Sequence, residues 1–381
     1  MEPGSVVPGS VDIVCLGESM VTFLPTAPGR LAEVPSFVRG IGGAESNVAC
    51  GLAASGHSAK WVGRVGADGF GEYLVAAMAS YGVDTSAVQR DPLRPTGVYF
   101  RTAGDRASHG HEVLYYRAGS AASAMSPSTV RYEDVWAGRI LHLSGITAAL
   151  SADCLALMRD LTARRAGRPL VSFDVNHRPG LWDAHAGACV LLDLARGADI
   201  VFVGEDEAEA AWGVRGADAI REALPEPEVV VVKRGALGAV AYGRCAGPFP
   251  TPPSPRLRPG GPPSSPYATF SGMSSNAGRA EESAAPRVDV VAHVGAGDAF
   301  AAGFLSATLR GLPVHDRLRH GHLMAAATLT VAGDLATPPP RAYADRLVAL
   351  DEHDWGRLRL GPGWTAAAEQ GPQDPQEVRI P

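Results

Sequence analysis

The residues most able to do chemistry form one short run toward the C-terminal end of the 381-residue chain: Gly295, Ala296, Gly297 and Asp298. Apolar residues at helical spacing follow over 299–309, so the run is predicted to form the turn before a helix. Glycine in such a turn permits a positive φ and the close approach of a ligand to the backbone. The unpaired amides and the positive end of the helix dipole then favour an anion.

Asp298 is unusual in such a turn, because a carboxylate repels phosphate. One interpretation is that Asp298 only caps the helix. The other is that it is a general base for a hydroxyl that attacks a phosphorus atom held by the amides of 295–297, as phosphoryl transfer requires. Two other phosphate motifs do not fit. A dinucleotide fingerprint has a third glycine where Phe300 stands, and a Walker loop needs a lysine, whereas Lys60 and Lys233 lie outside such a loop.

The composition limits the class of protein. The chain is 46% hydrophobic and 19% charged, which suits one large α/β domain or two smaller ones. Its formal net charge of −6 argues against a nucleic-acid binder, which is usually basic. The five cysteines are scattered without Cys-x-x-Cys pairing, and neither a signal peptide nor a membrane-spanning run is visible. These features predict a soluble cytoplasmic protein with reduced thiols.

A second glycine-rich turn lies near the N-terminus, at Gly42 and Gly43. A helical pattern follows over 44–55 and ends at Gly56, with Asn47 in its first turn. At that place the Asn47 amide could bond sugar hydroxyls, beside backbone N–H groups that face a polar ligand. The alternative is that the glycines only allow a tight turn between strand and helix.

Much of the remaining chain alternates short apolar runs with helical patterns. This alternation predicts right-handed βαβ crossovers and a mostly parallel sheet that is covered on both faces. Residues 97–102 and 112–116 differ, because they alternate polar and apolar side chains around a turn-rich segment and so predict an antiparallel hairpin. The other predicted elements are strands over 11–16, 61–65, 170–175, 200–203, 229–233 and 288–291 (the last one short and buried) and helices over 183–194 and 205–212.

The run from Gly295 to Phe300 resembles the C-terminal signature of the ribokinase-like (PfkB) carbohydrate kinases, and the turn at 42–47 is similar to their N-terminal signature. The resemblance covers 11–350 and implies a three-layer α/β/α sandwich with a mostly parallel central sheet. It also implies a small β-sheet lid built from strands within about 18–40 and 97–117. In that family the aspartate is the catalytic base, the Gly-Ala-Gly amides form an anion hole, and the N-terminal signature holds the sugar.

Three further runs, at 115–121, 141–147 and 174–178, resemble one branch of that family, the 2-keto-3-deoxygluconate kinases. A substrate of that branch carries a carboxylate, and a guanidinium group clamps a carboxylate bidentately. From local sequence alone, strand packing with a solvated cation is the more common explanation of the Tyr-Tyr-Arg stretch in the first run. The resemblance assigns substrate contacts to Gly42, Gly43, Asn47, Tyr99, Tyr115, Arg117, Ile146, Arg178 and Asp298.

The same resemblance assigns two segments to ATP and Mg²⁺. Lys233, Gly235 and Gly238 resemble the family's Lys-x-Gly-x-x-Gly turn beside the nucleotide, although a plain hairpin turn would also explain them. Gly204 stands where the family has asparagine, and Glu207 keeps the acidic residue that orders Mg²⁺ and its water. The acidic cluster at this point would also stabilise a helix N-terminus without any metal. On the resemblance, Gly204 belongs to the nucleotide site and Glu207 to a metal site.

Several segments depart from the family pattern. Residues 247–285 are rich in proline, glycine and serine, which predicts a low-complexity insertion. Residues 292–293 are Ala-His where the family has aspartate followed by threonine or proline, which alters the phosphate or metal geometry expected there. The residues after Asp334 are predicted to close the adenine side of the site or an ion-binding loop. Residues 351–381 are predicted to be a dispensable tail.

The predicted function is ATP-dependent phosphorylation of the terminal hydroxyl of a 2-keto-3-deoxy sugar acid, most like 2-keto-3-deoxygluconate. One alternative is a kinase of the same fold for a neutral sugar such as fructose or ribose, which has less need of two arginines. Another is a non-catalytic ligand-binding relative, consistent with the altered residues at 204 and 292–293. The expected partners are the sugar acid and ATP, without nucleic acid or membrane. A homo-oligomer that forms through the exposed strand edges of the lid is also expected.

Overall fold

An eight-stranded sheet forms the centre of the molecule, whose computed structural model describes residues 10–102, 112–182, 186–243 and 280–366. The strand order is β14-β13-β12-β11-β10-β9-β1-β4. Neighbours from β12 to β4 are parallel, whereas β13 and β14 are antiparallel to their neighbours. The strands are β1 (Val11–Leu16), β4 (Ala59–Val62), β9 (Gly138–Ser144), β10 (Leu170–Asp174), β11 (Ile200–Gly204), β12 (Val229–Lys233), β13 (Ala239–Gly243) and β14 (Ala280–Ser283).

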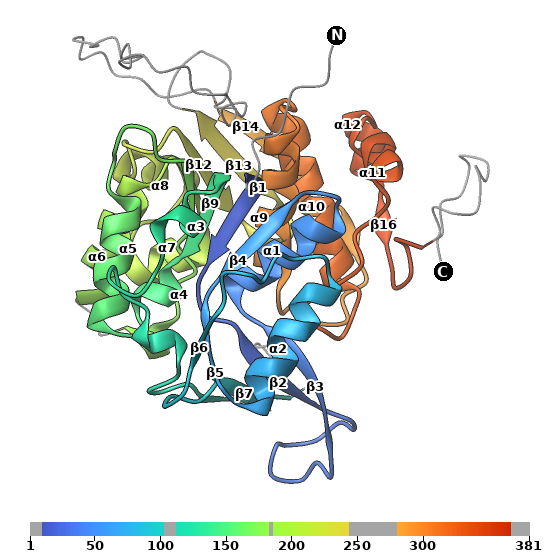
Figure 1. Ribbon diagram of the computed structural model, residues 1–381. Coiled ribbons are helices and arrows are strands. Elements are labelled where there is room, and N and C mark those ends of the chain that lie inside the picture. The colour runs from blue at the N-terminus through green and yellow to red at the C-terminus, as the bar shows by residue number, and fades with distance from the viewer. Residues whose placement is uncertain (1–9, 103–111, 183–185, 244–279, 367–381) are drawn as a thin grey trace, which may run out of the picture.

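Helices cover both faces of this sheet, which gives a three-layer α/β/α sandwich (Figure 1). Successive strand residues point to opposite faces. In β11, for example, Phe202 packs against Phe304 in one core, whereas Val201 belongs to the core on the other face. The predicted fold class is therefore confirmed. The first face carries α1 (Ala44–Ala54), α2 (Gly69–Ser80), α9 (Ala296–Leu309) and α10 (Val314–Leu329), and the second carries α5 (Ala152–Thr162), α6 (Ala186–Gly197), α7 (Glu205–Trp212) and α8 (Ala217–Ala223).

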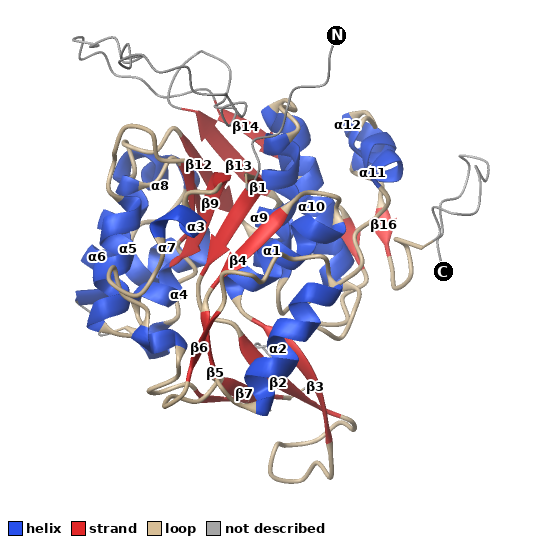
Figure 2. Cartoon of the chain, in the orientation of Figure 1, coloured by secondary structure: helices blue, strands red, loops and turns tan. Residues whose placement is uncertain are grey.

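A second, four-stranded sheet in the order β3-β2-β7-β8 forms the lid, and its strands lie beyond one end of the central sheet (Figure 2). The antiparallel pair β7–β8 confirms the predicted hairpin, and its turn at 103–111 lies outside the described residues. Tyr99 of β7, inside the sheet, is buried, whereas Leu114, Tyr115 and Tyr116 of the edge strand β8 are all exposed. The lid strands are β2 (Met20–Pro25), β3 (Phe37–Gly42), β7 (Val98–Arg101) and β8 (Val113–Tyr116).

The valine-rich segment before the catalytic run is not the buried strand that the sequence predicts. Only Arg287 and Val288 form a strand, β15, and it pairs with β16 (Arg359–Leu360) outside the central sheet. The side chains of Val290 and Val291 are 45% and 49% exposed. A short apolar run in the sequence does not reveal whether other elements will cover it. Here Val290 and Val291 stay largely uncovered.

The predicted insertion and tail both need new boundaries. Residues 244–279 lie outside the described residues, but 280–283 form the edge strand β14, so the predicted end of the insertion at 285 is wrong. In the tail, Trp355 and Trp364 are 1% and 0% exposed and pack in a third core with α10 and with α11 (Arg341–Val348). Residues 351–366 therefore pack against the rest of the fold, whereas the sequence predicts a dispensable tail from 351 onward.

The smaller elements connect these layers. The described cysteines, Cys15, Cys50, Cys154 and Cys189, are free thiols. Within the described ranges, no helix combines the length and the apolar surface that crossing a membrane would need. The remaining elements are β5 (Arg64–Gly66), β6 (Gln89–Asp91), η1 (Ala122–Ala124), α3 (Tyr132–Val135), α4 (Gly145–Ala148), η2 (Pro179–Leu181), η3 (Gly235–Leu237) and α12 (Glu352–Trp355).

Candidate active site

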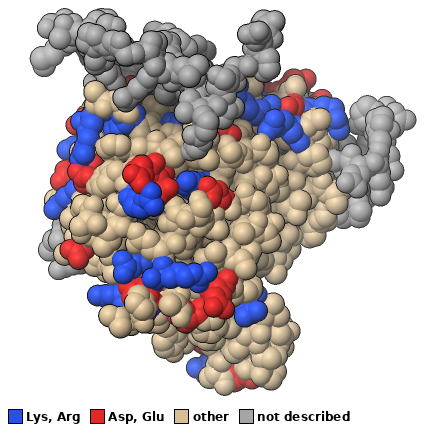
Figure 3. Space-filling view, viewed as in Figure 1, with Lys and Arg blue, Asp and Glu red and all other residues tan. Residues whose placement is uncertain are grey.

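A cavity of about 740 Å³ is lined by residues of the lid, of the N-terminus of α9 and of the segments that follow the parallel strands. Glu18 follows β1, Ile146 follows β9, Asn176 follows β10 and Glu207 follows β11, while Lys233 ends β12. Ligands of open α/β sheets bind outside the carboxyl ends of the strands, which is where these five residues lie. Charged side chains of both signs occur on the face of the molecule that Figure 3 shows.

Asp298 lies in the first turn of α9 and lines the cavity. The N-cap residue of this helix is Gly295, so Asp298 is not the cap that one interpretation of the sequence proposes. Its carboxylate instead accepts hydrogen bonds from Asn47 Nδ2 at 2.8 Å and from Asn176 Nδ2 at 3.5 Å. Two amides from distant parts of the chain therefore hold this carboxylate toward the cavity.

The surroundings of Asp298 also adjust its acidity. Burial raises the pKa of Asp298 to about 7. The hydrogen bond from Asn47 and the charges of Arg178 and Lys233 lower this pKa, whereas the charge of Asp174 raises it further. A general base is most effective when its pKa lies near the operating pH. The cavity thus contains a carboxylate that can accept a proton near neutrality.

The N-terminus of α9 supplies the predicted anion site. Gly295 has a φ of +78°, and a Cβ atom there would collide with the carbonyl oxygen of Asp334, so only glycine suits this position. Gly295 and Gly297 line the cavity, and Ala296 lies between them as the first residue of the helix. The first amides of a helix have no partner within it and carry the positive end of the dipole. A phosphoryl group beside Asp298 would meet these amides.

On the lid side, Tyr99 forms a hydrogen bond with Asp334, which lies in the segment after α10. The Tyr99 hydroxyl donates to Asp334 Oδ2 at 2.7 Å, and Arg101 Nη2 donates to Asp334 Oδ1 at 2.8 Å. All three residues are buried and line the cavity. Asp334 itself thus contacts the lid strand β7. That the residues after it close the adenine side of the site or an ion-binding loop stays a prediction.

Arg117 also reaches the cavity from the lid, but it already has an anionic partner. Its guanidinium forms an ion pair with Glu18, whose side chain is fully buried and also accepts a hydrogen bond from Ser120 Oγ at 2.6 Å. The Arg117 side chain is 10% exposed, and Tyr115 lies beside it with 5.7 Å between the guanidinium carbon and the ring centre. Arg117 is therefore fixed in place, and one of its terminal nitrogens faces Glu18.

Arg178 is the second arginine of the cavity and is less constrained. Its side chain is 33% exposed, and Nη1 lies 3.6 Å from Glu207 Oε1 and donates to the carbonyl of His177. Glu207 Oε2 accepts a hydrogen bond from the backbone N–H of Gly204 at 2.8 Å. Burial raises the pKa of Glu207. Glu207 therefore both closes the first turn of α7 and presents a carboxylate oxygen near the cavity.

The cavity brings together most of the residues that the sequence singles out. Four predicted residues are not among the lining residues: Gly204 ends strand β11, Gly235 and Gly238 lie in the turn after Lys233, and Ala296 lies between the lining residues Gly295 and Gly297. The positive φ of Gly235 and Gly238 is what the β12–β13 hairpin turn requires. The predicted residues that line the cavity are Gly42, Gly43, Asn47, Tyr99, Tyr115, Arg117, Ile146, Arg178, Glu207, Lys233, Gly295, Gly297 and Asp298.

Four further residues shape the site, and the sequence gives little signal for them. Asp174 and Asn176 lie in the run 174–178, which resembles the family, whereas Glu18 looks like an ordinary residue of a strand end. Glu45 is fully buried in α1 and accepts hydrogen bonds from Ser144 and Thr147, at the start of the segment that carries Ile146. Burial raises the pKa of Glu45 to about 6. This contact ties the helix of Asn47 to the segment that carries Ile146.

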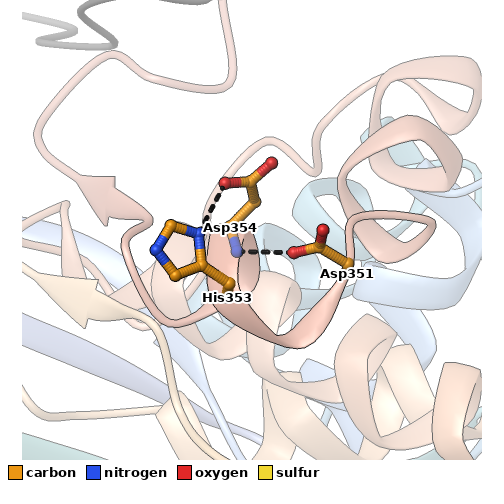
Figure 4. Close-up of side chains that lie close together, drawn as sticks. All are labelled: Asp351, His353 and Asp354. Atoms are coloured by element: carbon orange, nitrogen blue, oxygen red, sulfur yellow. Dashed lines mark hydrogen bonds and ion pairs between the residues drawn. The ribbon is translucent and has the colours of Figure 1, made fainter.

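A second group of possible metal ligands lies elsewhere, at Asp351, His353 and Asp354 (Figure 4). All three residues are exposed, and none lines the cavity. Asp351 accepts the backbone N–H of Asp354 as the N-cap of α12, and a ring nitrogen of His353 lies 3.2 Å from the Asp354 carboxylate. Capping of a short helix explains this arrangement.

An α/β/α sandwich that places a carboxylate beside a helix N-terminus, at the carboxyl ends of its parallel strands, is an arrangement suited to kinases of small hydroxyl-bearing molecules. The pfkB family carbohydrate kinase model matches residues 11–256 and 269–341. The chain therefore belongs to the pfkB family of carbohydrate kinases. It is a phosphotransferase that acts on a sugar hydroxyl.

Related proteins have the same organisation along most of the chain. The 2-dehydro-3-deoxygluconokinase of Bacillus subtilis (strain 168) is 34% identical over 342 residues, which cover 87% of this chain and 93% of that protein. Fructokinase-1 of Oryza sativa subsp. japonica is 31% identical over 240 residues, 61% of this chain and 73% of that one. The crystal structure of a PfkB protein from Polaromonas sp. JS666 has 31% identity and a TM-score of 0.70, with 88% and 99% of the two chains covered.

Proposed function

We propose that this kinase transfers the γ-phosphoryl group of ATP to the terminal hydroxyl of a 2-keto-3-deoxy sugar acid, 2-keto-3-deoxygluconate, and so forms the 6-phosphate. One observation carries the proposal: a single cavity is lined by Asp298, by Gly295 and Gly297 at the N-terminus of α9, and by both Arg117 and Arg178. Similarity to a 2-dehydro-3-deoxygluconokinase along most of the chain supports it.

The residues that line the cavity have different roles in this reaction. Asp298 accepts the proton of the attacking hydroxyl, and the amides of 295–297 stabilise the charge on the transferring oxygens. Asn47 donates to Asp298 and lines the cavity, so its amide can also bond the sugar. Arg178, the more exposed arginine, binds the carboxylate of the sugar acid, and Arg117 adds a second cation to the lining of the same cavity.

ATP would bring Mg²⁺ to the site, and Glu207 is the residue that would hold this ion directly or through water. Its carboxylate offers oxygen donors of the kind Mg²⁺ prefers, and its Oε1 is not needed for the contact with Gly204. When bound, the ion supplies positive charge to the phosphates. The turn at Gly235 and Gly238, with Gly204 nearby, is proposed to border the nucleotide.

A kinase for a neutral sugar is the second candidate, because one observation favours it. Glu18 forms an ion pair with Arg117, and this pair leaves less positive charge for a substrate carboxylate. Similarity to a fructokinase agrees with that alternative. Arg178 then decides between the two, since only a sugar acid offers it a carboxylate.

The test is coupled ADP release with ATP and Mg²⁺ and a panel of sugars. The panel contains the gluconate-derived and galactonate-derived 2-keto-3-deoxy acids, fructose and ribose. Turnover with a sugar acid alone is the expected result. Turnover with fructose or ribose alone would replace the sugar-acid assignment by the neutral-sugar one, and folded protein that releases no ADP with any of them would contradict both.

We also propose that the enzyme acts in the cytoplasm, where its free thiols stay reduced.

We further propose that the chain forms a homo-oligomer through the face of the lid that carries Leu114 and Tyr116. There Leu114 and Tyr116 are 48% and 62% exposed, and Tyr116 packs edge-on against Phe100 of β7. A second copy that covers this apolar face would remove these side chains from water.

A further inference from the structure

The ammonium group of Lys233 lies beside the anion site. Its Nζ atom is 3.5 Å from the position that a Cβ atom would take on Gly297, the second residue of α9. The Lys233 side chain is 18% exposed, and Lys233 lines the same cavity as Asp298. A cation at this place faces the amides that would receive a phosphoryl group, not the outer part of the β12–β13 turn.

Asp174 holds this ammonium in position. Lys233 Nζ donates to Asp174 Oδ2 at 2.9 Å and to Oδ1 at 3.2 Å, and the Asp174 side chain is 3% exposed. Burial lowers the pKa of Lys233, but the charges of Asp174 and Glu207 outweigh it, so that the pKa lies above its ordinary value. The lysine is therefore held as a cation by two contacts in one geometry.

The same carboxylate also supports the turn beside the base. Asp174 Oδ1 accepts the backbone N–H of Asn176 at 3.2 Å. Asn176 has a φ of +41°, a conformation that residues other than glycine adopt only at a cost in energy. In this conformation Asn176 Nδ2 lies 3.5 Å from Asp298 Oδ1. One buried carboxylate thus fixes both the cation and a partner of the base.

We propose that Lys233 is a catalytic residue that stabilises the transferring phosphoryl group, and that Asp174 is its positioning residue. This role rests on the proposed phosphoryl transfer. The sugar hydroxyl oxygen forms a bond to the γ-phosphorus, the bond from that phosphorus to the β–γ bridging oxygen breaks, the hydroxyl proton passes to Asp298, and ADP leaves. Lys233 adds an ammonium donor, held by Asp174, where the amide of Gly297 meets the transferring oxygens.

Steady-state kinetics of Lys233→Met test the role of the cation. We expect kcat to fall about 10²–10³-fold, as for the loss of one preorganised donor to a transition state. The KM values of sugar and ATP should stay within about threefold, and Lys233→Arg should restore part of kcat. The control is Lys60→Met, since Lys60 is the chain's other lysine and pairs with Asp84 and Asp134 outside the cavity. An unchanged kcat with a raised KM for ATP would make Lys233 a ground-state nucleotide contact and overturn the role.

A double-mutant cycle tests the positioning role of Asp174. Asp174→Asn keeps an oxygen that can accept the N–H of Asn176 but removes the charge that holds Lys233. We expect about a tenfold loss of kcat in the wild-type background and almost no further loss in Lys233→Met, because residues that act as a unit are not additive. Losses that multiply would show that Asp174 acts independently of Lys233.

A binding measurement makes the outcome independent of the sugar. ADP with aluminium fluoride and Mg²⁺ imitates the transferring phosphoryl group, and calorimetry compares its affinity with that of ADP and Mg²⁺ alone. Lys233→Met should weaken the fluoride complex about 10²–10³-fold and leave ADP binding within about threefold. Equal effects on both, or none on either, would contradict the role of Lys233. Absence of sugar turnover in the unmodified enzyme would instead contradict the proposed function.

Discussion

Replacement of Asp298 by asparagine removes a proton acceptor while leaving the shape of the site nearly unchanged. The carboxylate accepts Asn47 Nδ2 at 2.8 Å and Asn176 Nδ2 at 3.5 Å. In Asp298→Asn the new amide oxygen can still accept the hydrogen bond from Asn47, and the new amide nitrogen then faces Asn176, the more distant partner. Sugar binding and the start of α9 should therefore be retained, whereas proton transfer to this residue is lost.

The expected loss follows from the role of the base. Removal of a general base typically costs about 10²–10⁴-fold in rate. This range corresponds to about 3–5 kcal/mol of transition-state stabilisation, at about 1.36 kcal/mol for each tenfold change. The effect should appear in kcat, with the KM of the sugar within about threefold.

The same substitution, Asp298→Asn, should not lower the thermal stability of the folded protein, although it lowers kcat. Burial raises the pKa of Asp298 to about 7 in the folded protein. Because this value lies above that of the unfolded chain, about 3.9, the carboxylate costs more stability as the pH rises from about 4 through 7. At pH 8 the uncharged Asp298→Asn variant should therefore unfold at a temperature no lower than that of the wild type.

Coupled ADP release and thermal unfolding at pH 8 measure these two effects. The matched control is Asp153→Asn, which removes an exposed carboxylate from the first turn of α5, outside the cavity. The control should keep its kcat. A kcat of Asp298→Asn within threefold of the wild type, in a variant that unfolds at the wild-type temperature, would refute the assignment of the base.

Four further predictions concern pH, substrate recognition, the folded tail and assembly. A plot of kcat/KM against pH should fall on the acid side with a midpoint near 7, because Asp298 is then protonated; a profile flat down to pH 5 would contradict this. Arg178→Met should raise the KM of a sugar acid at least about tenfold and leave the KM of fructose or ribose unchanged, whereas equal changes would remove the carboxylate contact. Trp364→Ala should lower the free energy of unfolding by about 3–5 kcal/mol in a denaturant titration, because it empties a fully buried site; a change below about 1 kcal/mol would show that the tail does not stabilise the fold. In sedimentation, Leu114→Lys should shift an oligomer toward the monomer, and an unchanged oligomer would place the contact elsewhere.

The sequence alone determined the features that local patterns encode. Alternating strand and helix patterns gave the α/β class, since the periods of burial are properties of consecutive residues. The run from Gly295 to Asp298 and its resemblance to a kinase signature predicted a base and an anion site, because glycine, a carboxylate and a helix start lie next to one another in the chain. The cavity lining agrees with most of these assignments.

The tertiary structure decided what depends on distant partners. Asn47 and Asp298 are 251 residues apart, and only the packing of α1 against α9 brings them within hydrogen-bond distance. The pairing of Arg117 with the buried Glu18 likewise changes the charge that a substrate meets. Burial followed the same rule: Val291 is exposed although its segment is apolar, and Trp364 is fully buried although it lies in a glycine-rich tail. Residue type sets what a side chain can do, but its neighbours in space set its charge, its solvent and its role.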